Sequence, residues 1–288
     1  MEETIVVTFS ENTDNFTGQD GINLFYRRYP IPLERARLVI AHGLGEHSGR
    51  YGNIVNRLLP KDVSIWALDH RGHGKSGGKR GHVLNFEQYL LDLRRLVELA
   101  KSDPPEGRKI FLLGHSMGGL MALYFALRFA DLIDGVVASS PALGMVIAVP
   151  TIKNVLGKVM SFLWPGFLLN NGLDANKLSH DEGVVSAYQN DPLVHDRVSA
   201  RWFTEFLAAM EVVNQQVSRI RAPILMQIAG DDHLVNAQSS KLFFEKLTVS
   251  DKTLHVYDNL YHEIYNETGD QSEKVLNDLW QWLKIHIE

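Results

Sequence analysis

Short apolar runs alternate along this chain with longer stretches in which apolar residues recur every three or four positions. The short runs lie at residues 38–41, 63–68, 109–113, 135–139, 224–228 and 253–257. They show no regular alternation of apolar and polar residues, so each predicted strand must be buried on both faces. The longer stretches have a helical period and lie at residues 50–59, 86–100, 117–129, 237–247 and 272–287. This order predicts an α/β protein whose parallel sheet is covered by helices on both faces.

The N-terminal residues follow a different pattern. Residues 4–9 and 22–29 alternate between apolar and polar side chains, which is typical of strands with one buried face. Asp20 and Gly21 give a turn signal directly before the second segment. We therefore expect the two segments to form an antiparallel hairpin.

Residues 141–201 interrupt the order of strands and helices. This stretch lacks strand signals and contains apolar, helix-like segments followed by a polar portion near residues 170–181. A chain of 288 residues suits one α/β domain with an insertion better than two independent domains. We expect a core formed by residues 1–140 and 202–288, and a cap subdomain formed by residues 141–201.

Composition excludes several classes of function. The chain has no cysteine, so neither a disulfide nor a cysteine-bound zinc ion is possible. Its net charge of -5 argues against a nucleic-acid partner. The most apolar tract, residues 141–169, is broken by prolines and lysines and lacks the roughly 18 uninterrupted apolar residues of a membrane span. The N-terminus has no signal-peptide pattern, so we expect a cytoplasmic protein.

Residues 114–118 read Gly-His-Ser-Met-Gly and fit the pattern G-x-S-x-G. The pattern lies between the predicted strand 109–113 and the predicted helix 117–129, which is the context of a nucleophilic serine. Small residues must flank such a serine, because the strand and helix backbones approach closely at the turn. We predict that Ser116 is a catalytic nucleophile; the alternative is a glycine-rich turn with an idle serine.

A nucleophilic serine needs a base, and the base needs a carboxylate that orients it. In sheets with this serine turn, the acid and then the base follow the serine along the chain, each on a loop after a later strand. His262 follows the predicted strand 253–257 and is the candidate base, whereas His255 lies within that strand and His286 ends the last helix. Asp231 and Asp232 both follow the strand 224–228, so either is a candidate for the acid.

The tetrahedral intermediate of acyl transfer needs two backbone N–H groups that stabilise its oxyanion. One donor is expected at the residue after the nucleophile, Met117, and the other in the Gly-rich loop that follows the strand 38–41. Within that loop Leu44 is the natural donor. Several histidines lie nearby, at 42, 47, 70, 73 and 82, but none has a recognised metal-ligand spacing. We therefore expect no metal and no cofactor.

The chain resembles the monoacylglycerol lipase and lysophospholipase branch of the α/β-hydrolases. The matching segments run in family order across nearly the whole chain and lie at residues 42–47, 50–51, 68–76, 114–119, 140–142, 191–193, 261–263 and 266–267. In that branch the acid belongs to an Asp-x-Leu-hydrophobic string, which here begins at Asp232, so the resemblance favours Asp232 over Asp231. It also implies an α/β-hydrolase fold with a mostly parallel eight-stranded sheet and an inserted helical cap that covers an acyl-chain tunnel.

The first half of the predicted cap holds more large apolar side chains than a small subdomain can bury. We expect part of this surplus to line an acyl pocket or to contact a lipid surface. The candidate substrate-binding residues are Met145, Ile147, Val159, Phe162, Leu163 and Trp164.

Together these features predict a serine carboxylic-ester hydrolase that acts on a small ester with one fatty-acyl chain, a monoacylglycerol or a lysophospholipid. Peripheral membrane contact through the cap is a further expectation, and the sequence gives no indication of oligomeric state. One alternative is a peptidase or a small-ester esterase on the same scaffold. Another is a non-catalytic relative that binds a ligand, although such chains commonly lose a triad member and this chain has all three.

Overall fold

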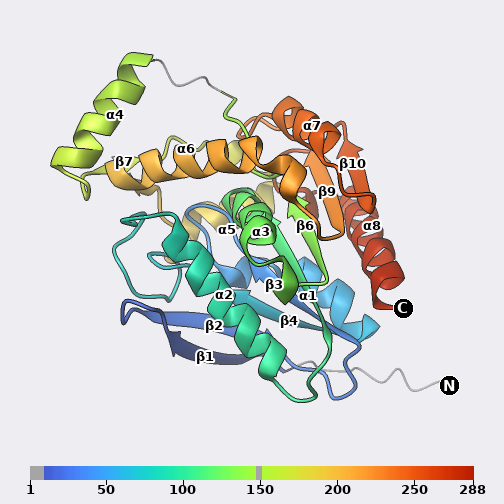
Figure 1. Ribbon diagram of the computed structural model, residues 1–288. Coiled ribbons are helices and arrows are strands. Elements are labelled where there is room, and N and C mark those ends of the chain that lie inside the picture. Colours follow the sequence, from blue (N-terminus) through green and yellow to red (C-terminus); the bar gives the residue numbers. More distant parts are fainter. Residues whose placement is uncertain (1–9, 147–150) are drawn as a thin grey trace.

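Eight strands form one sheet in the computed structural model, which describes residues 10–146 and 151–288. The strands lie in the order β1-β2-β4-β3-β5-β6-β9-β10 (Figure 1). Their bounds are β1 Asn12–Thr17, β2 Asn23–Tyr29, β3 Ala36–Ala41, β4 Val63–Leu68, β5 Lys109–His115, β6 Gly135–Ser139, β9 Ile224–Ala229 and β10 Lys252–Tyr257. Pairs that involve β1 or β2 are antiparallel, and all other pairs are parallel. The mostly parallel, eight-stranded sheet is confirmed.

Helices cover both faces of this sheet, as predicted. The core on one face includes residues of α1 Gly52–Leu58 and α8 Gly269–Ile287. The core on the other face includes residues of α2 Glu87–Ser102, α3 Met117–Arg128, α6 Ala200–Gln215 and α7 Ala237–Lys246. Strand β3 shows how the two cores divide a strand, because Val39 belongs to one core while Leu38 and Ile40 belong to the other. Since both faces are covered, the strand has no position for a solvated side chain.

The N-terminal hairpin differs from the expectation. Residues 4–9 lie outside the described residues, and β2 pairs instead with β1, with a turn at Gly21, where φ is +80°. The sequence of β1, Asn-Thr-Asp-Asn-Phe-Thr, is almost entirely polar, and five of its six residues are exposed. An edge strand that buries so little leaves no hydrophobic period to detect.

The chain between β6 and β9 adds no strand to the eight-stranded sheet among the residues that the structure describes. It contains α4 Thr151–Leu163 and α5 Glu182–Asn190, and a small antiparallel ribbon of β7 Leu168–Asn170 and β8 Arg197–Ser199. The ribbon was not expected, because strands of three residues are too short to show a period. Helix α6 packs against both α4 and α3, so it connects this segment to the core (Figure 1). Within the described ranges, no helix is long and apolar enough to span a bilayer.

Candidate active site

The turn between β5 and α3 holds Ser116 in an unusual backbone conformation, with φ 55° and ψ -116°. The turn is stabilised by a hydrogen bond from the Ser116 N–H to the carbonyl oxygen of Ser139, at 2.9 Å. A Cβ atom at Gly114 would lie 1.9 Å from the carbonyl oxygen of Gly118, and one at Gly118 would lie 2.0 Å from that of Ala41. Both flanking positions therefore require glycine, which explains the G-x-S-x-G pattern physically.

His262 and Asp232 meet on neighbouring loops at the carboxyl ends of β10 and β9. The His262 Nδ1 atom lies 2.7 Å from Oδ2 of Asp232, and both side chains are almost completely buried. The other carboxylate oxygen, Oδ1, accepts the backbone N–H groups of Leu234 and Val235 at 2.8 and 2.9 Å. The Asp232 carboxylate is therefore fixed in place, and it orients the imidazole so that Nε2 is available for a proton.

The neighbouring candidates have other environments. Asp231 has a half-exposed side chain and pairs with His233 at 3.2 Å. His255 lies on β10, 3.9 Å from Asp278, and His286 contacts the carbonyl oxygen of Trp282 at the end of α8. Of these groups, only Asp232 contacts His262.

Burial and charge shift the pKa values of His262 and Asp232 in opposite directions. Burial alone lowers the pKa of His262, but the Asp232 carboxylate outweighs that effect and raises the pKa above its usual value. Burial also opposes ionisation of Asp232, yet His262 and the two N–H donors hold the pKa of that carboxyl below its usual value. Asp232 thus remains ionised and can stabilise an imidazolium.

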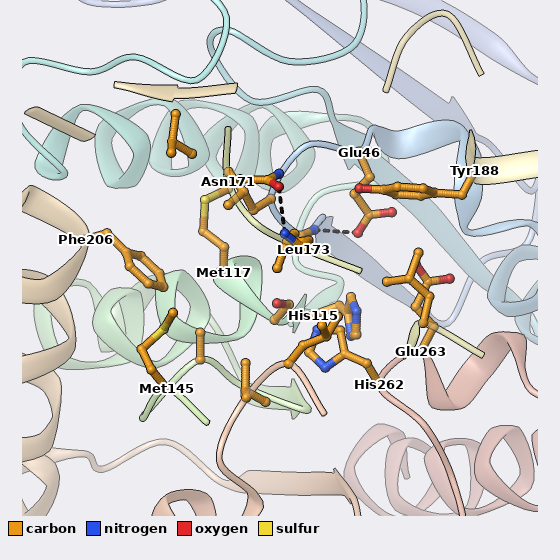
Figure 2. A pocket seen from close by; sticks show the side chains of 18 of the residues that line it. Glu46, His115, Met117, Met145, Asn171, Leu173, Tyr188, Phe206, His262 and Glu263 are labelled. Atoms are coloured by element: carbon orange, nitrogen blue, oxygen red, sulfur yellow. Dashed lines mark hydrogen bonds between the residues drawn. The ribbon is translucent and has the colours of Figure 1, made fainter. Parts of the chain in front are cut away.

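A cavity connects these groups with the loop after β3 (Figure 2). Ser116, His262, Leu44 and Met117 all line it, so the predicted nucleophile, base and two oxyanion donors share one space. Its empty volume is about 770 Å³, including space open to solvent.

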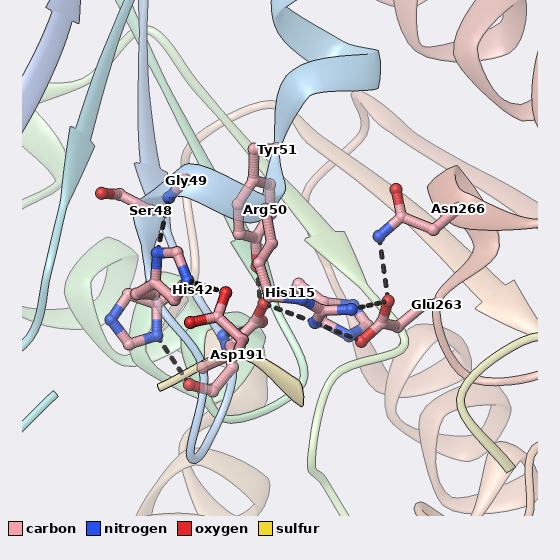
Figure 3. A network of polar contacts seen from close by, with 12 residues as sticks. His42, Ser48, Gly49, Arg50, Tyr51, His115, Asp191, Glu263 and Asn266 are labelled. Atoms are coloured by element: carbon pink, nitrogen blue, oxygen red, sulfur yellow. Dashed lines mark hydrogen bonds and ion pairs between the residues drawn. The ribbon is translucent and has the colours of Figure 1, made fainter. Parts of the chain in front are cut away.

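One end of the cavity is polar, and the sequence analysis did not identify its residues. Glu46, Tyr188 and Glu263 line this end (Figure 2). Arg50 donates hydrogen bonds to both oxygens of Glu263, at 2.6 and 2.9 Å, and a third to Glu46 at 3.0 Å. Its guanidinium also lies over the Tyr188 ring, 4.7 Å from the centroid. These charges form a buried, hydrogen-bonded network (Figure 3).

The two glutamates of this network are not equivalent. Burial and the nearby Glu263 raise the pKa of Glu46, although Arg50 opposes the shift. Burial opposes ionisation of Glu263 as well, but Arg50 holds the pKa of Glu263 below its usual value. Glu46 also accepts the N–H of Gly43 at 2.6 Å, which fixes the loop that carries Leu44.

His115 lies between the predicted base and the polar end. Its ring centroid is 4.7 Å from that of His262, and its Nδ1 atom is 3.3 Å from the Ser139 hydroxyl. Burial and the neighbouring His262 lower the pKa of His115 to about 3, so this imidazole is neutral at physiological pH. A neutral imidazole can both donate and accept a hydrogen bond to a bound ligand.

The other end of the cavity is apolar. Of the predicted cap residues, Met145 lines the cavity. Val159, Phe162, Leu163 and Trp164 are instead exposed on the surface, with Phe162 81% exposed, and Ile147 lies outside the described residues. The apolar lining comes mainly from residues that were not predicted to bind substrate: Leu173, Leu178, Val198, Trp202, Phe203, Phe206, Leu234 and Val235.

No cluster of three or more potential metal ligands occurs within residues 10–146 and 151–288. The histidines of the early motifs pack on one another: the rings of His42 and His70 are 4.0 Å apart, and those of His42 and His73 are 5.3 Å apart. All three are fully buried, and burial holds the pKa of each well below its usual value. They fix the backbone beside the loop of Leu44, since His70 donates its N–H to His42 Nε2 at 3.0 Å.

An eight-stranded, mostly parallel sheet with a serine on the sharp turn after β5 and an Asp–His pair at the same edge defines an α/β-hydrolase. Residues 33–269 match the family model Hydrolase_4, described as serine aminopeptidase, S33, and the chain belongs to this family.

Relatives of similar length carry lipase names. The chain is 34% identical over 284 residues to the monoacylglycerol lipase of Mycolicibacterium smegmatis, which covers 98% of this chain and 100% of that protein. It is 31% identical over 283 residues to the monoglyceride lipase of Rattus norvegicus, covering 96% of this chain and 92% of the relative. The crystal structure of Paleococcus ferrophilus monoacylglycerol lipase superposes with a TM-score of 0.84 at 38% identity, covering 91% of this chain and 99% of that one. The predicted resemblance is confirmed, and the chain is a serine ester hydrolase similar to monoacylglycerol lipases.

Proposed function

We propose that this chain hydrolyses monoacylglycerols through a Ser116–His262–Asp232 triad and an acyl-enzyme intermediate. One observation carries the proposal: a single cavity has a polar end and an apolar end, with Ser116 and His262 in its lining. A monoacylglycerol has the same division, because its ester joins a polyol to one hydrocarbon chain.

The polar end supports a glycerol-type leaving group. Glu46, Glu263 and Tyr188 present two carboxylates and a phenol, and His115 adds a neutral imidazole. Hydroxyl groups both donate and accept hydrogen bonds, so they complement such a set. Arg50 neutralises part of the negative charge, which favours an uncharged polyol over a free amine.

The apolar end supports a single acyl chain. Trp202, Phe203 and Phe206 lie on one helix, α6, and line this end together with Met145. Burying a methylene group stabilises a complex by about 0.8 kcal/mol, so such a wall contributes strongly to binding a long chain. One tunnel admits one chain, so monoacyl substrates should be preferred over triacylglycerols.

In the proposed mechanism, His262 Nε2 takes the proton of the Ser116 hydroxyl as Oγ attacks the ester carbonyl carbon. The N–H groups of Leu44 and Met117 stabilise the oxyanion, and Asp232 stabilises the imidazolium. The imidazolium then gives its proton to the departing glycerol oxygen, which leaves an ester on Ser116. Water, deprotonated by His262, attacks that ester, and the imidazolium returns the proton to the Ser116 oxygen as the fatty acid leaves. No step requires a cofactor.

The test is a substrate panel on the purified chain: a long-chain monoacylglycerol, a diacylglycerol, triolein, a lysophospholipid and an aminoacyl-naphthylamide. We expect the monoacylglycerol to give the highest kcat/KM. Faster turnover of triolein would contradict the substrate proposal, and faster turnover of the naphthylamide would favour the peptidase alternative. A fluorophosphonate probe should label the wild type and not Ser116→Ala, and equal labelling of both would remove Ser116 as the nucleophile.

We also propose that the exposed apolar part of the cap contacts lipid surfaces. Phe162, Leu163, Trp164, Phe167 and Leu169 are each about half or more exposed and lie within a short stretch of chain. An apolar patch of this kind is typical of an interaction site. Replacing Phe162 and Trp164 with Ser should reduce co-sedimentation with phosphatidylcholine vesicles without changing turnover of a water-soluble ester; unchanged co-sedimentation would refute the contact. The cytoplasmic location expected from the sequence stays a prediction.

A further inference from the structure

Glu267 is a buried carboxylate outside the cavity that holds two distant segments together. It follows the short turn Ile264–Asn266, and its side chain is completely buried. Its Oε1 atom accepts the backbone N–H of Tyr261 at 2.7 Å and lies 2.9 Å from Nδ1 of His180. Its Oε2 atom accepts the backbone N–H of His180 at 3.1 Å. The Glu267 side chain therefore accepts hydrogen bonds from two segments of the chain.

The first segment is the loop that carries His262. Tyr261 directly precedes His262, so the hydrogen bond from its N–H to Glu267 fixes the backbone at the point where the predicted base begins. The Tyr261 ring is also held, because it stacks on the His180 ring at a centroid distance of 3.7 Å. A shift of about 1 Å at a catalytic group can cost about 100-fold in rate.

The second segment belongs to the predicted cap. His180 lies just before α5, whose first turn is capped by Asp181. Two further hydrogen bonds join the same segments: Glu263 N–H to the Leu178 carbonyl oxygen at 2.8 Å, and the Ser179 hydroxyl to the Asn266 carbonyl oxygen at 2.8 Å. The cap contributes Leu178 and Tyr188 to the cavity, so its place relative to His262 shapes the site.

We infer that Glu267 is a positioning residue, which sets the His262 loop and fixes the cap segment Ser179–Asp181 against it. This inference rests on the proposed role of His262 as the base. Glu267 is not among the residues that line the cavity, so it acts through the backbone of Tyr261 and not on the substrate. A carboxylate is required because both of its oxygens accept N–H donors, whereas an amide offers one acceptor and one donor.

The test compares Glu267→Gln with Glu34→Gln. Glu34 is a matched control, because it is also a buried carboxylate in a hydrogen bond (to Arg37, at 2.6 Å). It lies before the amino end of β3, whereas the site lies at the carboxyl ends of the parallel strands. With p-nitrophenyl butyrate, Glu267→Gln should lower kcat by about 10- to 100-fold. KM should change by less than about threefold, and hydrogen exchange should accelerate in the peptide 258–266. Glu34→Gln should leave kcat within about twofold of the wild type.

The variant His180→Ala distinguishes the effect of Glu267 on the His262 loop from its effect on the cap segment. It removes the contact of the His180 side chain with Glu267 and its stacking on the Tyr261 ring, but it keeps the hydrogen bond from the Tyr261 N–H to Glu267, so kcat for the short ester should stay within about twofold. Hydrogen exchange should accelerate in the peptide 176–184 only. If Glu267→Gln does not fold, Glu267→Asp replaces it, since a carboxylate shorter by one methylene cannot reach both segments and should lower kcat in the same way.

Two outcomes in the Glu267 variants overturn the inference: a kcat equal to that of Glu34→Gln, or accelerated exchange at 176–184 without any loss of kcat. Failure of the proposed function would give a different result from failure of the inference on Glu267. His262→Ala would then retain activity, whereas an inactive His262→Ala together with a fully active Glu267→Gln would refute the role of Glu267 alone.

Discussion

Arg50 binds both carboxylate oxygens of Glu263, the residue directly after His262, at 2.6 and 2.9 Å. This contact joins the turn just before α1 to the loop after β10, and Asn266 supports it with a further hydrogen bond to Glu263 at 2.9 Å (Figure 3). The polar end of the cavity is thus held by an ion pair that is almost closed to water.

Removal of this arginine should be strongly destabilising. In Arg50→Met, Glu46 and Glu263 stay buried without their cation, and breaking a buried pair in this way typically costs about 3–5 kcal/mol. Urea unfolding followed by circular dichroism measures the change. The control is Arg94→Met, which loses an exposed pair with Glu98 and should change stability by less than about 0.5 kcal/mol. Equal stability of the two variants would contradict the prediction.

The two adjacent aspartates should differ sharply in their effect on catalysis. Asp232→Asn keeps the shape but loses the charge that orients and stabilises His262, so kcat should fall by about 10⁴-fold. Asp231→Asn changes a half-exposed side chain paired with His233 and should leave kcat within about twofold. Steady-state kinetics with p-nitrophenyl butyrate distinguish them, and a large loss in Asp231→Asn would reverse the assignment.

Activity should decline on the acid side at a pH above the ordinary histidine value of about 6.5. The base must be neutral to accept a proton, and Asp232 raises the pKa of His262. The logarithm of kcat/KM should therefore fall with unit slope once pH drops below that raised pKa. In Asp232→Asn the residual activity should persist to lower pH, because the main cause of the upward shift is gone. An acid limb that does not move in this variant would argue against the pair.

The free energy of unfolding should decrease as pH falls below about 6.5. His42, His70 and His73 have folded-state pKa values far below that of the unfolded chain, so in acid the unfolded state binds more protons. Each contributes stability that is present above the unfolded pKa and is lost at up to about 1.4 kcal/mol per pH unit below it. His262 acts in the opposite sense, since its raised pKa favours folding in acid, but it is outnumbered, because the pKa values of His82, His115 and His195 are lowered as well. Urea unfolding from pH 7 to pH 5 checks this, with His70→Gln expected to reduce the slope and a slope that does not change in His70→Gln contradicting the prediction.

Chain-length preference should depend on the apolar end of the cavity. Phe206→Trp adds bulk to a lining residue, so kcat/KM for a 16-carbon monoacylglycerol should fall at least about 10-fold relative to a 4-carbon ester. Phe162→Trp is the control, because Phe162 is 81% exposed and does not line the cavity. A comparable change in both variants would mean that the acyl chain lies elsewhere.

Much of the sheet could be predicted because its central strands are buried on both faces. Gly135–Ser139 was predicted with its observed bounds, and β3 and β9 were located within two residues of their ends. Helix α6, by contrast, was not predicted, although Trp202, Phe206 and Met210 recur every four positions and mark its buried face. Helix α6 begins inside residues 141–201, where the order of strands and helices is lost. No predicted strand preceded it, so its helical period was not recognised as part of the α/β core.

The residues of the candidate site likewise divide into those that could be predicted from the sequence and those that could not. Ser116 and His262 were predicted from the residue types that acyl-transfer chemistry requires at particular loops, and both line the one cavity described above. Glu46 and Glu263 could not, because their role depends on Arg50, and a charged residue in a sequence carries no sign of whether it will be buried. The exposed residues Phe162 and Trp164 show the converse, since apolar character alone does not distinguish a cavity wall from a surface.

The backbone conformation of Ser116 lowers the stability of the fold, although the proposed chemistry needs a serine there. A non-glycine residue at φ 55° and ψ -116° is strained, and such strain costs on the order of 1–3 kcal/mol. Glycine at this position would relieve the strain and stabilise the native state, but it would remove the hydroxyl group. The proposed nucleophile therefore lies at a position where the chain would be more stable without its side chain.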